Sequence, residues 1–216
     1  MRALTLVGLT ACTPLVSPPP TEDVRCRCDA ITLPAEPVTD EAGLLALLRE
    51  TQVAAYYELD GVTLQVTAIP DLAYFRSVID SDTLDDAHPE ARVYRVQVDP
   101  LVLTDPPSPE ALAAVLAHEL GHVLDYSTMT VREYLEFGVW YGTQDPLTST
   151  GLSDYERATD AMALERGCAD GLTEMRTWVY AHASPDVLAE KQHNYDSPAE
   201  IAAWVDANGR CGDAAP

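Results

Sequence analysis

The segment His118-Glu-Leu-Gly-His122 carries the residues best suited to chemistry. On a helix, residues four positions apart lie one turn above each other on the same face, so both imidazoles can bind one metal ion. Glu119 lies about 100° round the helix, where its carboxylate can reach a metal-bound water without binding the metal. A zinc ion lowers the pKa of that water, and the carboxylate then takes its proton. The pattern is typical of a hydrolase with one Zn2+ ion.

The residues around this pentapeptide predict a buried helix. Ser108 is a good N-cap, and Pro109 suits the first helical position. A wide apolar stripe follows, made of Leu112, Val115, Leu116, Leu120, Val123 and Leu124. A second stripe of small residues, where another backbone could approach closely, consists of Ala113, Ala114, Ala117 and Gly121.

Two histidines leave a hydrolytic zinc site incomplete, because such sites have three protein ligands and a water. Glu156 is the first candidate for the third ligand. Asp160 lies four residues later, on the same helix face, and could accept the free ring N–H of a ligating histidine. Ser153 precedes Glu156 by three residues, so a capping box at the start of a helix is the alternative interpretation.

The two motifs together resemble the gluzincin metallopeptidases, in which H-E-x-x-H is followed by E-x-x-x-D on a second helix. The segment around Glu156 also resembles the E-x-x-A-D of the membrane-associated prenyl-protein and heat-shock peptidases, with Thr159 in place of alanine. The resemblance covers residues 91–172. It implies a zincin-like fold in which His118, His122 and Glu156 hold Zn2+, and Glu119 is the general base for cleavage of a polypeptide substrate. We expect that substrate to pair with an edge strand near residues 92–98, where the sequence alternates.

Other families fit less well. The metzincin pattern is excluded, because Asp125 and Thr128 stand where its glycine and its third ligand would be. Asp145, in Gly142-Thr-Gln-Asp, resembles the third ligand of the aspzincins, although a loop turn also explains it. Glu200 is a more distant candidate that fits a capping box better. A non-catalytic zinc-binding envelope lipoprotein is the alternative function.

Residues that would stabilise an oxyanion are not distinguished by their pattern. The eligible side chains are Tyr126, Tyr155, His182 and His193. His88, which lies beside a proline in the acidic segment 80–90, is expected to face solvent.

The composition predicts one domain of the α+β class. The chain has 216 residues, 47% of them hydrophobic, which is enough for one core. Thirty-five acids against thirteen bases give a net charge of −22, which argues against binding to nucleic acid or to anionic lipid surfaces. We expect a helix-dominated, zincin-like domain over residues 25–216, with a small antiparallel or mixed sheet packed on the metal-binding helix.

Helices are predicted at 39–49, 131–141, 153–181 and 197–205, with Gly167 and Gly171 as weak points in the third. Asp60-Gly61 is a strong hairpin signal between arms at 52–59 and 62–69. A helix that runs through Tyr57 is the alternative for the first arm.

The first residues resemble a bacterial lipoprotein leader. Residues 1–11 have a positive start and a short apolar stretch, and Leu9-Thr-Ala-Cys12 resembles a lipobox. This resemblance implies a signal peptide over 1–11, a lipid anchor on Cys12 and a proline-rich tether over 12–24. Thr13 after the cysteine favours an outer-membrane lipoprotein of the cell envelope.

Four further cysteines remain, namely Cys26, Cys28, Cys168 and Cys211. An even number in an exported chain predicts two disulfides, with Cys26 and Cys28 each bonded to one of the other two. A zinc site made of all four is the alternative, but Cys-x-Cys lacks the usual spacing.

Overall fold

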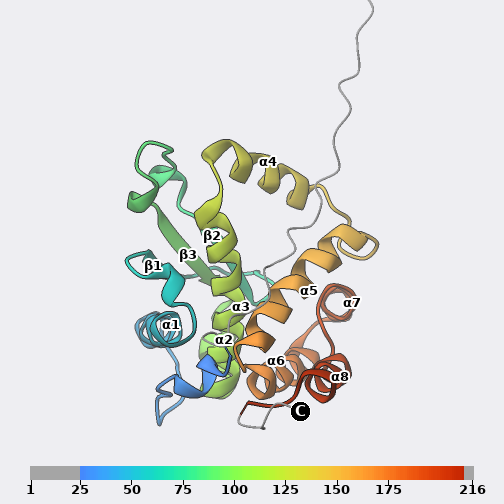
Figure 1. Ribbon diagram of the computed structural model, residues 1–216. Helices are drawn as coiled ribbons and strands as arrows, with labels where there is room; N and C mark the ends of the chain where they lie inside the picture. The colour runs from blue at the N-terminus through green and yellow to red at the C-terminus, as the bar shows by residue number, and fades with distance from the viewer. Residues whose placement is uncertain (1–24, 212–216) are drawn as a thin grey trace, which may run out of the picture.

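A computed structural model describes residues 25–211 and contains a small mixed sheet among helices (Figure 1). The strands are β1 (Thr63–Ala68), β2 (Phe75–Ile79) and β3 (Val93–Val98), in the order β1-β3-β2. β3 therefore lies in the middle, parallel to β1 and antiparallel to β2. This arrangement confirms the predicted helix-dominated α+β class.

Helix α3 (Pro109–Thr128) runs through the centre of the molecule (Figure 1). The sheet and α1 (Glu41–Ala55) pack against it on one side, and α5 (Thr150–Glu165) and α6 (Ala169–His182) on the other. The Ser108 hydroxyl accepts a hydrogen bond from the Ala111 amide, as an N-cap should. Every residue from Ala111 to Val123 is buried, so the pentapeptide lies inside the core.

The small-residue stripe of α3 allows close helix packing, as predicted. A Cβ added to Gly121 would lie 2.8 Å from Thr159 Cγ2 of α5. Ala114 meets Gly171 of α6, where an added Cβ would lie 2.7 Å from the Ala114 side chain and 2.5 Å from the Glu110 carbonyl oxygen. Both α5 and α6 therefore pack so closely on α3 that these positions have no room for a larger side chain.

The remaining helices surround this centre. They are α2 (Pro100–Thr104), α4 (Val131–Gly142), α7 (Pro185–Asn194) and α8 (Pro198–Asn208), with short 3-10 turns η1 (Arg27–Ala30), η2 (Tyr57–Leu59), η3 (Ser81–Thr83) and η4 (Pro89–Ala91). The predicted capping box of α8 is present, with Ser197 and Glu200 bonded reciprocally.

Two strand predictions were wrong. Residues 52–55 continue α1, and η2 follows, so the hairpin across Asp60-Gly61 does not form. The Gln52 side chain instead donates a hydrogen bond to the Leu59 carbonyl and ties the turn to the helix, while β1 pairs with β3. The strand at 92–98 is not an edge strand either, because β1 and β2 flank it.

The helix predicted over 153–181 is two helices, with the break at Gly167. This glycine has a φ of +91°, which a residue with a side chain adopts only with strain. An added Cβ would also lie 2.6 Å from Cys211 Sγ and 3.0 Å from Cys26 Cα. The break therefore gives the chain ends room to pack between α5 and α6.

The two predicted disulfides are present, as Cys26–Cys211 and Cys28–Cys168. They span 185 and 140 residues: the first joins the two ends of the described chain to each other, and the second joins the N-terminal end to Cys168 at the start of α6. Because all four cysteines are paired, the alternative four-cysteine zinc site is ruled out.

The predicted signal peptide, the lipidated Cys12 and the tether lie outside the described residues. Between residues 25 and 211, no helix is long and apolar enough to cross a bilayer.

Candidate metal centre

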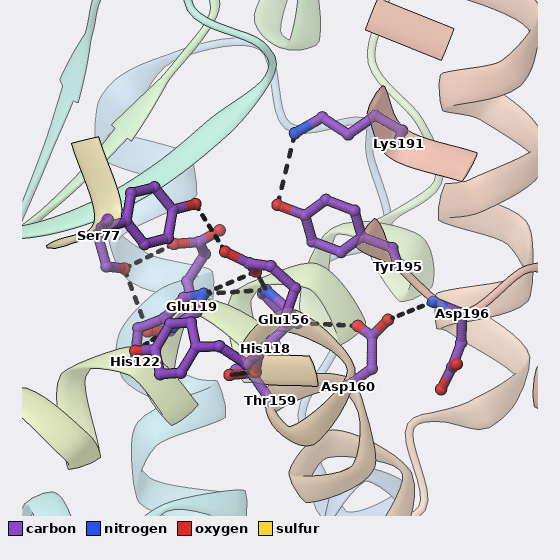
Figure 2. A network of polar contacts seen from close by, with 12 residues as sticks. Ser77, His118, Glu119, His122, Glu156, Thr159, Asp160, Lys191, Tyr195 and Asp196 are labelled. Atoms are coloured by element: carbon purple, nitrogen blue, oxygen red, sulfur yellow. Dashed lines mark hydrogen bonds and ion pairs between the residues drawn. The ribbon is translucent and has the colours of Figure 1, made fainter. Parts of the chain in front are cut away.

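Three buried side chains converge at the contact between α3 and α5 (Figure 2). The Nε2 atoms of His118 and His122 lie 3.1 Å apart, and each is 3.3 Å from Oε2 of Glu156. The three residues are 3%, 6% and 1% exposed, respectively. The structure thus brings together the three ligands predicted from the sequence, in a group that could hold a metal ion.

The geometry of this group fits a tetrahedral metal site. With metal–ligand distances of about 2.0–2.1 Å, neighbouring ligand atoms of a tetrahedron lie about 3.3 Å apart. The three observed separations are close to this value. Glu156 Oε2 is buried, and its contacts among the described residues are those with the two imidazole nitrogens, so a cation bound between them would stabilise this carboxylate oxygen.

His118 is held by a charged group behind the site. Its Nδ1 lies 2.8 Å from Oδ1 of Asp160, which is fully buried one turn along α5 from Glu156. Arg176 of α6 binds both oxygens of Asp160, at 2.6 and 2.8 Å, and the Asp196 amide donates at 3.0 Å. A histidine that donates through Nδ1 turns its Nε2 lone pair to the site, as metal binding requires.

These contacts shift the pKa values of both partners. Burial alone would raise the pKa of Asp160, but Arg176 and His118 together lower it to about 2. Burial alone would lower the pKa of His118, yet hydrogen bonds to Asp160 and Glu156 raise it to about 9. Asp160 therefore stays ionised at neutral pH.

His122 has a neutral partner. Its Nδ1 lies 3.0 Å from the hydroxyl of Tyr155, which burial keeps protonated by raising the pKa far above its ordinary value. The ring of His122 also stacks on Tyr126 and Tyr155, with centroids 6.1 and 5.2 Å away. An aromatic cluster that includes Phe137 of α4 surrounds them.

Glu156 is fixed from α4. The Tyr141 hydroxyl donates a hydrogen bond of 2.7 Å to Oε1, which leaves Oε2 to face the histidines. Burial alone would raise the pKa of Glu156, but the two histidines hold it well below its ordinary value. Helix α5 begins at Thr150 with Ser149 as its N-cap, so the capping-box interpretation of Glu156 was wrong.

Glu119 lies beside the ligands and is oriented by the sheet. Its Oε2 accepts a hydrogen bond of 2.7 Å from the hydroxyl of Ser77 on β2 (Figure 2). The same hydroxyl lies 3.1 Å from the backbone carbonyl oxygen of Glu119.

A hollow, here called the cleft, opens next to His118 and Glu119. Its apolar wall comes from the start of β2 and from α3 and α6, and its polar wall from α6 and α7. The lining residues are Ala73, Tyr74, Phe75, Val115, His118, Glu119, Met175, Arg176, Val179, Lys191 and Tyr195. His118, one of the three candidate ligands, and the adjacent Glu119 therefore line a cavity that has both apolar and cationic walls.

The rival ligands lie elsewhere. Asp145 is exposed and accepts a hydrogen bond from the Leu147 amide, so a loop turn does explain it. Glu200 caps α8 and pairs with Arg157. His88 is exposed, as predicted.

The side chains expected to assist an oxyanion are not on the cleft. Tyr126 and Tyr155 surround His122, and Tyr155 already contacts its Nδ1. His182 is an exposed residue bound to Trp178 and Asp105. His193 is also absent from the cleft lining.

Four polar residues of the site were missed in the sequence, namely Ser77, Tyr141, Arg176 and Tyr195. Tyr195 lines the cleft, with its ring 5.6 Å from that of His118. Burial holds its pKa well above the ordinary value, so the hydroxyl keeps its proton. No local pattern marks these residues, because each is brought to the site by the packing of its element against α3 or α5, including Tyr141 on α4, the next helix along the chain.

Comparisons with protein-family models, with curated proteins and with solved structures found no match to this chain.

Proposed function

We propose that this protein is a zinc-dependent peptidase of gluzincin type. The observation that carries the proposal is the buried group of His118, His122 and Glu156, whose two Nε2 atoms and Oε2 atom lie 3.1–3.3 Å from one another. Two imidazoles and a carboxylate form a donor set that suits Zn2+ at a hydrolytic site. Such an ion would polarise a carbonyl and make a water molecule more acidic.

Glu119 would act as the general base. Its carboxylate would take a proton from the attacking water and later deliver it to the amine of the leaving fragment, which balances the hydrolysis of the peptide bond. The Ser77 hydroxyl supports this role, because its hydrogen bond of 2.7 Å orients the carboxylate. Tyr195 would donate a hydrogen bond from its hydroxyl to the oxygen of the attacked carbonyl, where negative charge develops, and would keep its proton.

The substrate would pair with β2, the edge strand beside the site. The Asp80 amide donates to the Val93 carbonyl of β3, and the Tyr74 carbonyl accepts from the Asp99 amide just after β3. Because the residues of an antiparallel strand alternate in this bonding, the backbone groups of Ser77 face away from β3, towards the free edge of β2. An extended peptide could add there as a further strand. Beyond Ser77, the hydroxyl of Tyr134 on α4 already occupies the Ile79 amide, at 2.9 Å. Pairing would therefore extend from Ser77 towards the cleft.

We also propose that the protein works outside the cytoplasm. The two disulfides support this location, since such bonds persist in oxidising compartments. Attachment to a membrane through Cys12 is part of the same proposal and is checked by mass analysis of the N-terminal fragment after expression in a bacterial envelope.

The decisive experiment uses the full chain and its Glu119→Gln variant. We expect one zinc ion per chain in both proteins, and hydrolysis of unstructured peptides that falls by about 10²–10⁴-fold in the variant. Zinc binding without hydrolysis in the parent protein would favour a non-catalytic zinc-binding lipoprotein. Failure to bind zinc would overturn both functions.

A further inference from the structure

Lys191 is the single lysine of the chain, and it lines the cleft next to the candidate metal centre. The residue is only 9% exposed, although lysine is rarely buried in proteins. It belongs to α7 and approaches the hydroxyl of Tyr195 (Figure 2). A buried ammonium group beside a proposed active site needs an explanation.

The other cation of the cleft, Arg176, has a structural explanation. Its guanidinium binds both oxygens of Asp160, at 2.6 and 2.8 Å, and so supports His118. Lys191 has no comparable partner among the described residues. Its Nζ lies 3.5 Å from the Tyr195 hydroxyl and 3.6 Å from Glu190 Oε1, and both distances exceed those of ordinary hydrogen bonds.

The surroundings of Lys191 favour an anion in the cleft. An ammonium group has three N–H donors, and neither of its long contacts satisfies them well. The apolar wall opposite, formed by Met175 and Val179 among others, lowers the local polarity and strengthens an ion pair made there. The net charge of −22 repels an anion, but most of that charge is distant from the cleft, and salt at 0.1 M largely screens exposed charges that lie more than about 10 Å away.

We propose that Lys191 binds a carboxylate of the substrate and makes the protein prefer to cleave close to an acidic residue or to a free C-terminus. The inference rests on the proposed function, because it assumes that the ligand of the cleft is a peptide. A carboxylate suits the position, since it would meet the Lys191 ammonium while the peptide backbone lies against β2 and Glu119. A structural role, in which Lys191 only packs on the Tyr195 ring at 4.7 Å, is the alternative.

A kinetic experiment on the zinc-loaded protein distinguishes the carboxylate-binding role of Lys191 from the structural one. Its substrates are matched pairs of fluorogenic peptides that differ by Glu against Gln at one position, or by a C-terminal acid against an amide. We expect kcat/KM to favour the carboxylate member of one pair by about 10–100-fold, the range for a hydrogen bond to a charged group. The pair that shows the effect identifies whether the carboxylate is a side chain or a terminus.

Variants of Lys191 test whether this residue causes the preference for the carboxylate substrate. In Lys191→Met, which keeps the apolar stem, the ratio within the pair should fall to about 1, and Lys191→Arg should retain most of it. Arg132→Met is the matched control, because it removes one positive charge from an exposed site on α4 and should leave the ratio unchanged. If Lys191→Met lowers both rates equally, or leaves the ratio intact, the carboxylate site is overturned.

A binding measurement makes this test independent of catalysis. The metal-free Glu119→Gln protein is titrated with the same peptides, labelled for fluorescence anisotropy. Tighter binding of the carboxylate member by about 10-fold, lost in a protein that also carries Lys191→Met, supports the site even if no peptide is hydrolysed. Equal affinities overturn it, even if the protein proves to be a zinc peptidase.

Discussion

The two histidines of the candidate metal centre have different kinds of support. Behind His118, an ionised Asp160 is held by Arg176 and by a backbone amide, all of them in the core between α5, α6 and the segment before α8. Behind His122, the partner is the neutral hydroxyl of Tyr155 within an aromatic cluster. Both arrangements orient Nε2 towards Glu156, but the first does so with charge and the second with packing.

The elements that support the two histidines also differ in how deeply they are buried. The support of His118 depends on helices buried in the centre of the molecule. The cluster around His122 depends partly on α4, and none of the twelve described residues of that helix is buried. Tyr134 and Tyr141 of α4 nevertheless reach β2 and Glu156. We therefore expect changes on the His118 side to lower both stability and metal affinity, and changes on the His122 side to lower mainly metal affinity.

The largest effect should follow Asp160→Ala. The substitution leaves Arg176 buried without its anion, so the free energy of unfolding should fall by about 3–5 kcal/mol. Zinc affinity should fall by about 10–100-fold, because His118 loses its orienting partner. Urea unfolding and competition with a chelator measure the two losses. Asp154→Ala, at an exposed position of the same helix, is the control, and equal behaviour of the two variants would refute the distinction.

A pH effect of intermediate size should belong to the His118 side. The pKa of His118 in the folded, metal-free protein is raised from 6.5 to about 9. A raised folded pKa stabilises the fold fully below pH 6.5, and the contribution is lost as pH rises through 9. This contribution of His118 to the free energy of unfolding amounts to roughly 3 kcal/mol.

Thermal unfolding of the metal-free protein between pH 6 and about 9.5 checks this decline. The decline should be absent when zinc occupies the site, since bound imidazoles carry no extra proton. Asp160→Asn should flatten it, whereas Tyr155→Phe should leave it in place. If Tyr155→Phe abolished the loss of stability at high pH and Asp160→Asn did not, the His122 side would carry the charge-dependent stability and the comparison would be wrong.

The smallest effect is expected from Tyr155→Phe. The ring remains in the aromatic cluster, and only the hydroxyl facing His122 Nδ1 is lost. Zinc affinity should fall by about 10-fold, with less than about 1 kcal/mol lost from the free energy of unfolding. Tyr180→Phe removes a buried hydroxyl that has no partner among the described residues, so it is a matched control. A stability loss as large as that of Asp160→Ala would show that both sides are equally structural.

The sequence was sufficient where the periodicity of one helix decides the geometry. His118 and His122 share a face of α3, and Glu156 and Asp160 share a face of α5, because four residues make about one turn. The starts of α3 and α8 also follow from the local N-cap residues Ser108 and Ser197. In these elements the neighbours in sequence are the neighbours that matter.

Features that depend on contacts between distant elements were not predictable in this way. The parallel pairing of β1 with β3 joins segments about thirty residues apart, so the local hairpin signal at Asp60-Gly61 was misleading. Arg176 and Ser77 carry no motif, and their roles come from packing of α6 and β2 beside α3. Glu156 and Asp145 were both compatible with the sequence, and only the crossing of α5 over α3 separates them.

The bond between Cys26 and Cys211 turns nearly the whole described chain into one covalent ring, with Cys28–Cys168 as a second link across it. A single backbone cut between Cys28 and Cys168, for example in the exposed residues 85–90, would open the ring without releasing a fragment. The two pieces would run as one species on a non-reducing gel and separate after reduction. A cut in this segment would therefore separate Ser77 from Glu119 in sequence but keep the two pieces, and both residues, in one molecule.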